Sequence, residues 1–100
     1  MDFKVIFHKS FLDDFEQIVT RIVALDPTAA FTFGNLVVRT CESLSFFPER
    51  HPTVRQRPGI RRLVVHKYYK VFYRVRRGAK TVEILRFWDG RRGIEPRTEG

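Results

Sequence analysis

Cysteine is almost missing from the sequence, which has only Cys41 among its 100 residues. A lone cysteine excludes an intrachain disulfide framework and a cysteine-based metal site. Long apolar runs are also missing, since none approaches the roughly 18 residues that a membrane-spanning helix needs. The first residues lack the basic-then-apolar pattern of a secretory signal. We therefore expect a cytoplasmic protein with no membrane partner, and Cys41 as a small buried hydrophobe rather than a nucleophile.

Carboxylates are scarce relative to cations, and the imbalance lies in one half of the chain. The formal net charge is +8, from 19 Lys and Arg against 11 Asp and Glu. Residues 1–48 carry four cations and six carboxylates, whereas residues 49–100 carry fifteen cations and five carboxylates. Arginine outnumbers lysine fourteen to five, which favours planar, bidentate contacts with phosphate or carboxylate groups. The second half therefore predicts an acidic partner: nucleic acid, a protein that handles nucleic acid, or an acidic protein segment.

The apolar residues of the first half repeat with helical spacing. Residues 2–7 are typical of a short strand, and Ser10 begins a pattern that resembles a capping box. Asp26-Pro27 is typical of the end of one helix and the start of the next. The two apolar stripes consist of Phe11, Phe15, Ile18, Ile22 and Leu25, and then of Ala30, Phe33, Val37, Cys41 and Leu44. The spacing predicts a strand and an antiparallel helix pair that ends near Phe47.

The second half changes to the two-residue period of strands. Residues 48–59 contain three prolines and a glycine, which predicts a loop. We expect strands at about 60–66, 69–76 and 81–88, joined as an antiparallel meander. In the middle strand, one face should pack on the helices through Tyr69, Val71, Tyr73 and Val75, and the other should be exposed and cationic through Tyr68, Lys70, Phe72, Arg74 and Arg76. Alternation in the last strand leaves open which side faces the helices.

Together these elements predict an α+β fold in two layers. An N-terminal strand and an antiparallel helix pair precede a three-stranded antiparallel meander, with the helices on one face of the sheet. A chain of this length with 43% hydrophobic residues suits a single core. We expect one domain over residues 1–92 and a flexible tail over residues 93–100, where Gly, Pro and charged residues dominate.

The second half also carries a family resemblance. Its run PGIRRLVVHKYYKVFYRVRRGAKTVEILRFWDGRR, from Pro58 to Arg92, resembles the RelE/ParE superfamily of bacterial type II toxin–antitoxin toxins, and the ParE branch in particular. The resemblance extends over about residues 3–92. It implies the fold described above and a small toxin that forms a hetero-oligomer with a cognate antitoxin, which holds it inactive.

The resemblance implies one of two activities. ParE-like toxins bind DNA gyrase and trap it on cleaved DNA, whereas RelE-like toxins cut mRNA on the translating ribosome. We favour a ParE-like inhibitor of gyrase, neutralised by a ParD-like antitoxin with an acidic C-terminal segment. The alternative is a RelE-like ribosome-dependent mRNA endoribonuclease.

Groups able to transfer protons are scarce in the region that carries the resemblance. A metal-free ribonuclease needs a base for the 2′-hydroxyl and an acid for the leaving oxygen. No tyrosine follows Tyr73, and Asp89 stands where many superfamily members carry histidine. Neighbouring arginines should lower the pKa of Asp89 and make it a poor base at neutral pH. We therefore name no catalytic residue, cofactor or metal, and lean against an enzyme.

The residues expected to grip the target are mainly cations of the second half. Arginines hold phosphate or carboxylate groups well, and an aromatic side chain between them adds stacking area. The predicted target-binding residues are Arg62, Lys70, Arg74, Arg86, Trp88, Asp89, Arg91 and Arg92. Among them Arg91 and Arg92 follow the last strand directly and are the first candidates.

Overall fold

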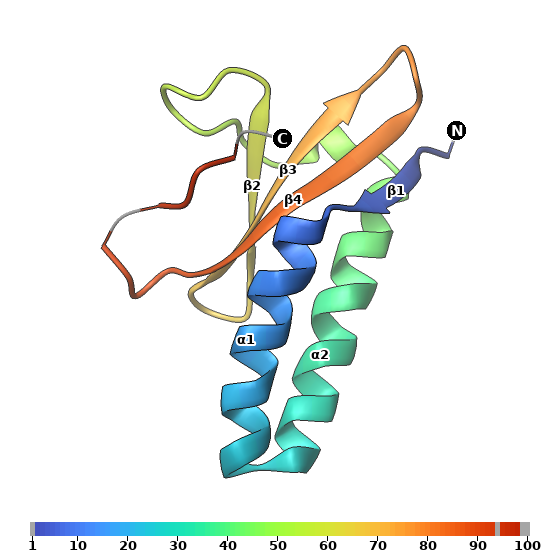
Figure 1. Cartoon of the computed structure of the whole chain (residues 1–100). Helices are drawn as coiled ribbons and strands as arrows, with labels where there is room; N and C mark the ends of the chain where they lie inside the picture. The colour runs from blue at the N-terminus through green and yellow to red at the C-terminus, as the bar shows by residue number, and fades with distance from the viewer. Residues whose placement is uncertain (1, 94, 99–100) are drawn as a thin grey trace.

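The computed structural model describes residues 2–93 and 95–98. The elements are β1 (Lys4–Phe7), α1 (Lys9–Leu25), α2 (Pro27–Glu42), β2 (Ile60–Val65), β3 (Tyr69–Arg76) and β4 (Thr81–Asp89), with short 3-10 turns at Ser43–Ser45 and Pro48–Arg50. Figure 1 shows the two helices as a hairpin that extends beyond the sheet. This is the predicted α+β architecture of a strand, a helix pair and an antiparallel meander.

The four strands form one mixed sheet in the order β1-β4-β3-β2. The meander is antiparallel throughout, whereas β1 pairs with β4 in parallel. Parallel pairing requires a crossover connection between the strands. Here that connection consists of the helix pair followed by β2 and β3, and both helices pack on one face of the sheet.

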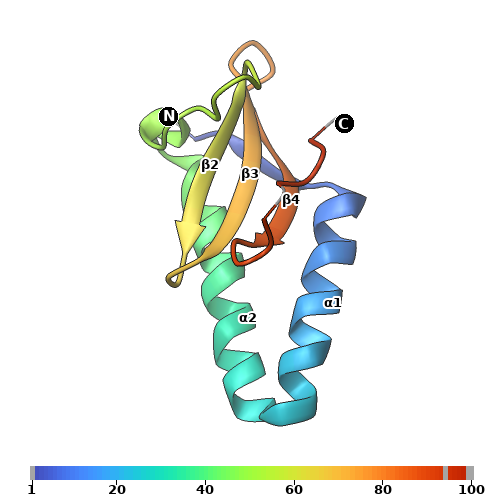
Figure 2. The same ribbon diagram turned by 90° about the vertical axis from the view of Figure 1, so that its left-hand side faces the viewer.

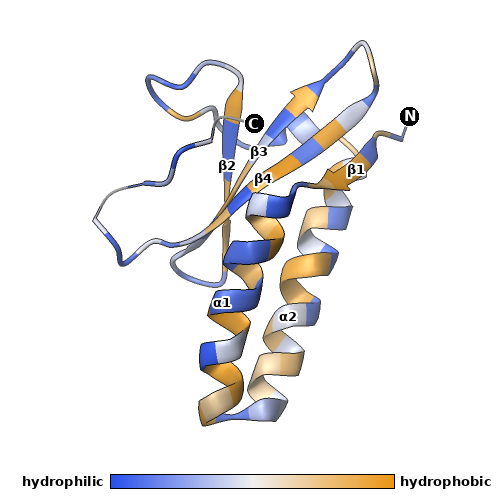
Figure 3. Cartoon of the chain, viewed as in Figure 1, coloured by the Kyte–Doolittle hydropathy of each residue, from blue (hydrophilic) through white to orange (hydrophobic). Residues whose placement is uncertain are grey.

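The main core lies between the sheet and the helices. Its buried residues include Phe11 and Val37 from the helices and Val71 and Tyr73 from β3, each at most 1% exposed. The face predicted for Tyr69, Val71, Tyr73 and Val75 is therefore confirmed. Figure 3 shows apolar positions recurring along both helices, including the part of the hairpin that extends beyond the sheet.

The single cysteine has the role that the sequence predicts. Cys41 is fully buried in the main core, and burial raises the pKa of its thiol to about 12. It is thus a packing residue, as predicted. Among the described residues, no helix is long and apolar enough to cross a membrane.

The predicted start of α1 is wrong. His8 is the N-cap residue, and it makes no side-chain capping bond. Ser10 lies within the helix and its hydroxyl donates to the carbonyl of Leu85 in β4, at 2.7 Å. The hydroxyl is used for a tertiary contact because β1 ends before this part of β4.

The predicted end of α2 is also wrong, although its start is confirmed. The Asp26 carboxylate accepts from the Ala29 amide, with Pro27 in the first turn, as the sequence indicates. The helix ends at Glu42 rather than near Phe47, and a 3-10 turn follows. Phe47 itself has a left-handed backbone with φ of 45° and cannot continue an α-helix.

A β-bulge decides which side of β4 faces the helices. The register with β3 shifts between Phe72 and Tyr73, so that Phe72 pairs with Arg86 and Tyr73 with Ile84. One extra residue on β4 reverses the alternation at that point. Ile84 and Phe87 consequently both reach the helix-side core, although simple alternation places them on opposite sides.

The second face of the sheet is less open than predicted. Phe72, expected to be exposed, is 0% exposed in a small second core with Val54, Ile60 and Leu85. Val54 comes from the loop before β2, which folds back along that strand through the Thr53–Arg61 bridge. A proline-rich loop thus covers part of the face.

We predict that Asp14 holds α1 on β4. Its carboxylate accepts from the Phe87 amide at 3.1 Å and from two nitrogens of Arg86. Asp14→Ala should lower the free energy of unfolding by about 2 kcal/mol, since it leaves a half-buried cation and a strand amide without their acceptor. Urea unfolding measures this. The matched control is Asp13→Ala, because Asp13 pairs only with exposed Lys9; equal losses in the two variants would contradict the prediction.

Candidate functional site

The predicted target-binding residues lie on two faces of the sheet. The face opposite the helices, called the outer face here, carries Arg62, Lys70, Arg74, Arg86 and Trp88, which are cross-strand partners of one another or of the buried Phe72 and Ile60. Figure 2 looks toward this face and shows the C-terminal segment in front of the sheet. Asp89 pairs with Tyr69 and belongs to the helix side instead.

Arg62 and Lys70 converge on one carboxylate. Nη1 of Arg62 lies 2.8 Å from Oε2 of Glu95, and Nζ of Lys70 lies 2.9 Å from the same oxygen. Burial opposes ionisation of Glu95, but the hydrogen bonds from Lys70 and Arg62 outweigh it and lower the pKa of that carboxyl. The two predicted cations therefore form an anion-binding pair.

Arg74 is tied to the neighbouring strand. Its Nε lies 2.8 Å from Oε1 of Glu83, and Nε of Arg76 approaches the same oxygen at 2.8 Å. The other oxygen of Glu83 lies 3.4 Å from His8. Partial burial opposes ionisation here too, but the two arginines outweigh it and lower the pKa of Glu83. Arg74 thus stabilises the β3–β4 pair.

Arg86 joins the sheet to α1 and to the C-terminal segment. Its Nε and Nη2 contact the two oxygens of Asp14 at 2.6 and 3.0 Å, a bidentate geometry. Its remaining Nη1 donates to the Arg97 carbonyl at 3.0 Å. Because all three guanidinium nitrogens are engaged, Arg86 mainly stabilises the packing of β4 against α1 and the C-terminal segment.

Asp89 and Arg91 form a tight pair at the end of β4. Asp89 is 9% exposed and accepts from the Arg91 amide at 3.0 Å and from the guanidinium at 2.6 and 2.9 Å. The Arg91 guanidinium also lies over the Tyr68 ring, 4.3 Å from its centroid. Hydrogen bonding from Arg91 outweighs burial and lowers the pKa of Asp89. This carboxylate is accordingly a poor general base.

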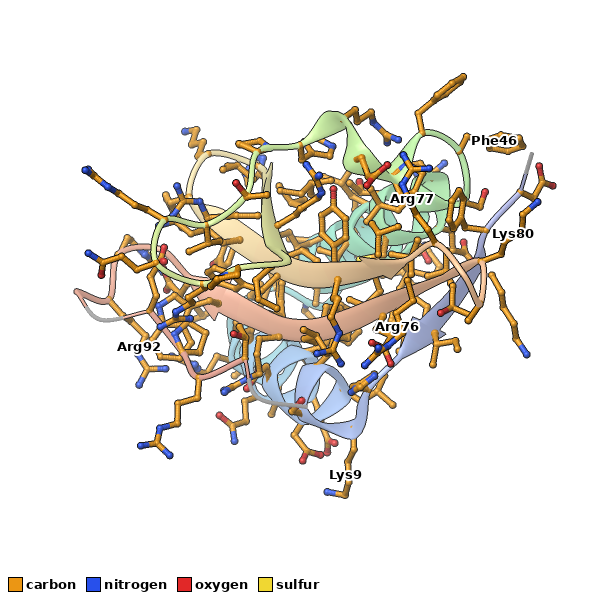
Figure 4. All side chains as sticks on the ribbon, turned by 90° about the horizontal axis from the view of Figure 1, so that it is seen from above. Lys9, Phe46, Arg76, Arg77, Lys80 and Arg92 are labelled. Atoms are coloured by element: carbon orange, nitrogen blue, oxygen red, sulfur yellow. The ribbon has the colours of Figure 1, made fainter. Side chains whose placement is uncertain are left out.

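Arg92 turns the other way. Its guanidinium lies 4.3 Å from the centroid of the Trp88 ring, on the outer face. Figure 4 shows Arg92 at the periphery, far from the group formed by Arg76, Arg77 and Lys80 at the opposite end. Within the part of the chain that the structure describes, Arg92 has no carboxylate partner. The adjacent arginines therefore serve different faces, a separation that the sequence does not reveal.

Trp88 combines packing with an unmet hydrogen bond. Its ring packs against the second core formed around Phe72 and Leu85. The indole Nε1 is buried and has no hydrogen-bond partner among the described residues. An unpaired buried donor carries a desolvation cost.

Gly90 allows the end of β4 to approach the turn before β3. Its amide donates to the Tyr68 carbonyl at 2.8 Å. A Cβ at this position would lie 2.3 Å from that carbonyl oxygen, which belongs to the backbone and cannot move alone. The close approach brings Tyr68 beneath Arg91 and so shapes the site.

The carboxylates that contact these cations are Asp14, Glu83, Asp89 and Glu95, and each is engaged in an ion pair. The tyrosines beside Arg91 are Tyr68 and Tyr69, and burial raises the pKa of Tyr69. Among residues 2–93 and 95–98, no three His, Cys, Asp or Glu side chains are grouped as metal ligands. The site is therefore suited to binding anionic or aromatic groups. The predicted lack of catalytic residues, cofactors and metal stays a prediction.

An apolar groove lies on the helix side of the same end of the sheet. It is lined by residues of α1, α2 and the β2–β3 turn, among them Ile22, Phe33, Leu36 and Tyr69. The hairpin beyond it exposes further large apolar residues, with Leu25 and Phe31 at 88% and 74% exposure. Apolar surface gathered in this way is typical of a protein-binding site.

The family model for the ParE toxin of the type II toxin–antitoxin system parDE matches residues 5–94. The chain belongs to the ParE toxin family. This confirms membership of the RelE/ParE toxin superfamily, which the run from Pro58 to Arg92 indicated. A search of curated protein sequences finds no match.

Two solved structures of toxin–antitoxin systems resemble this ParE-family chain. One is a chromosomal ParDE system from P. aeruginosa, with a TM-score of 0.73, 20% identity, and coverage of 85% of this chain and 92% of that one. The other is the toxin–antitoxin complex RelBE2 from Mycobacterium tuberculosis, with a TM-score of 0.63, 25% identity, and coverage of 89% and 92%. Both likenesses confirm the fold.

Sequence reasoning missed two carboxylates that organise the site. Asp14 contacts residues 72 and 73 positions away, and nothing local signals that pairing. Glu95 carries a weak signal, because it is the sole carboxylate between residues 90 and 98. The structure places residues 95–98 against the outer face; whether the tail is flexible stays a prediction.

We predict that Gly90→Ala destabilises the ParE-family chain by about 2 kcal/mol or more, because the added methyl group meets backbone. Gly78→Ala is the control, since a Cβ there meets nothing within 4 Å. Thermal unfolding followed by circular dichroism compares the two variants. Equal melting temperatures would contradict the prediction, because they would show that the backbone at Tyr68 moves aside without loss of stability.

We predict an acid-sensitive contribution from the Asp89–Arg91 pair. The pKa of Asp89 is lower in the folded chain than its ordinary value of 3.8. A lowered pKa stabilises the fold above the ordinary value, and this contribution is lost as the pH falls through the folded value. Asp89→Asn removes it, so the loss of unfolding free energy between neutral pH and about pH 3 should be smaller in the variant. Identical pH profiles would contradict this.

Proposed function

We propose that this chain is the toxin of a type II toxin–antitoxin system and that it inhibits DNA gyrase by binding it. Membership of the ParE family supports the toxin assignment. The observation that carries the mode of action is the pair formed by Asp89 and Arg91. The carboxylate best placed to accept a proton is held ionised by three hydrogen bonds from its neighbour, so the site favours binding over proton transfer.

We further propose a cognate antitoxin as the partner of the helix side. Both solved relatives are toxin–antitoxin systems. The groove around Ile22, Phe33 and Leu36 and the exposed Leu25 and Phe31 provide apolar anchors that suit an amphipathic helix. An acidic segment of a ParD-like antitoxin would complement the cations beside this groove.

The alternative, ribosome-dependent mRNA cleavage, has one observation in its favour. Arg62 and Lys70 meet at a single oxygen on the outer face, with Trp88 opposite Lys70 on the next strand. Such a set can hold a phosphate beside a stacked base. The carboxylate in this set, Glu95, has a lowered pKa and is a poor base for the 2′-hydroxyl, which is why we place this function second.

We predict that the purified chain inhibits DNA supercoiling by gyrase and that Arg92→Ala weakens inhibition at least about tenfold. Arg92 is exposed, and among the described residues its side chain contacts the Trp88 ring and no carboxylate, so the fold should survive its loss. A loss of about 1.4 kcal/mol of binding corresponds to that tenfold change. Supercoiling and DNA-cleavage assays over a toxin titration give the measurement.

Arg39→Ala is the matched control, because Arg39 is an exposed arginine on α2, away from the outer face. It should inhibit gyrase as the unaltered chain does, and added antitoxin should relieve inhibition in both. Cleavage of mRNA on translating ribosomes, with supercoiling unaffected at the same concentrations, would replace the proposed function with the alternative.

A further inference from the structure

We propose that the outer face is a binding site for an extended peptide that carries a carboxylate, and that the chain's own segment Glu95–Thr98 occupies it as an internal competitor. The segment does not merely lie near the sheet. Glu95, Pro96 and Arg97 in turn each supply an acceptor, and together they bind four cationic side chains. The proline is buried.

The first contact is made by a carboxylate. Oε2 of Glu95 accepts from Arg62 on β2 and from Lys70 on β3, at 2.8 and 2.9 Å. The side chain of Glu95 is 24% exposed, so both interactions are partly shielded from water. Two cations from neighbouring strands that meet at one oxygen define a position for a single carboxylate.

The next contacts are made by the peptide backbone. Arg57 donates to the Pro96 carbonyl, and Arg86 donates to the Arg97 carbonyl at 3.0 Å. Pro96 is buried, and a proline brings no amide donor that the site would have to satisfy. Successive carbonyls recognised after one carboxylate are features of a polypeptide. A nucleic acid offers charged oxygens at a different spacing and no neutral backbone carbonyls.

The loop that covers Phe72 helps to build the same site. Arg57 comes from this loop, and with Pro58, Ile60 and Arg74 it lines a pocket that Arg97 and Thr98 also border. The site therefore draws on β2, β3, β4 and the loop, and it is complete only in the folded chain.

A tail attached through a few residues competes strongly with an external peptide. β4 ends at Asp89, only a few residues before Glu95, and attachment through a short stretch of chain gives effective concentrations of about the millimolar range. An external peptide must displace the tail before it binds. Weakening the tail should then raise the apparent affinity for such a peptide without creating any new contact.

The test uses the full chain and a fluorescein-labelled peptide with the sequence of residues 93–98, GIEPRT, followed by fluorescence anisotropy. Glu95→Gln in the chain should tighten peptide binding about fivefold, because the internal competitor loses its two charge-assisted hydrogen bonds. The control Asp13→Asn changes the net charge equally on exposed α1 and should bind the peptide as weakly as the unaltered chain.

Two further measurements define the site. A peptide with Gln in place of Glu should bind the Glu95→Gln chain more weakly than GIEPRT does. Adding Arg62→Gln to that chain should remove the gain, with circular dichroism to show that the variant is folded; if it is not, Lys70→Gln takes its place. Equal affinity of the unaltered and Glu95→Gln chains would overturn the proposal.

A gain for a single-stranded hexanucleotide without a gain for the peptide would also overturn it, by identifying the site as one for nucleic acid. The inference does not depend on the cellular target of the toxin. Because neither gyrase nor ribosomes enter the assay, its failure and the failure of the proposed function are separate results.

Discussion

The contact between Asp14 and the open edge of β4 is the constraint on which the rest of the structure depends. β1 pairs with β4 only as far as Ile84, so the strand edge beyond it lacks a neighbouring strand. Ser10 of α1 supplies the missing donor to the Leu85 carbonyl, and Asp14 supplies the missing acceptor for the Phe87 amide. A helix thus completes the sheet where a strand would otherwise add, which fixes the helix hairpin relative to the site and blocks edge pairing.

The same contact sets the electrostatics of the outer face. Asp14 holds Arg86, while Glu83 and Glu95 hold four further cations of the face. A chain with a net charge of +8 nevertheless uses much of its positive charge internally. The acidic partner expected from composition therefore does not meet a bare cationic sheet. It must exchange contacts with carboxylates already in place, and the net gain from each exchange is small.

The fold followed from sequence because its signals are local. Helical spacing from Phe11 to Leu25, the Asp26 cap and the two-residue period after Ile60 each concern neighbours in the chain. The errors arise where distant residues decide. The Ser10 hydroxyl donates to the Leu85 carbonyl instead of capping α1. The bulge beside Phe72 reverses the side-chain alternation of β4, so that β4 contributes to the cores on both faces of the sheet. The eight predicted site residues could be named from sequence as six cations, one aromatic and one carboxylate, but their division between two faces depends on that bulge and on the end of β4.

Arg91 and Arg92 show how this division matters for function. Adjacent in sequence, they stack on Tyr68 and Trp88, which point to opposite faces of the sheet. Arg91 is held by a buried carboxylate, so its removal acts on the fold as well as on any target. Arg92 lies on a partly buried indole and has no carboxylate partner among the described residues. A partner that brings a carboxylate or phosphate to Arg92 would therefore break no ion pair that the described residues form there, which makes this corner of the outer face the least costly place for binding to begin.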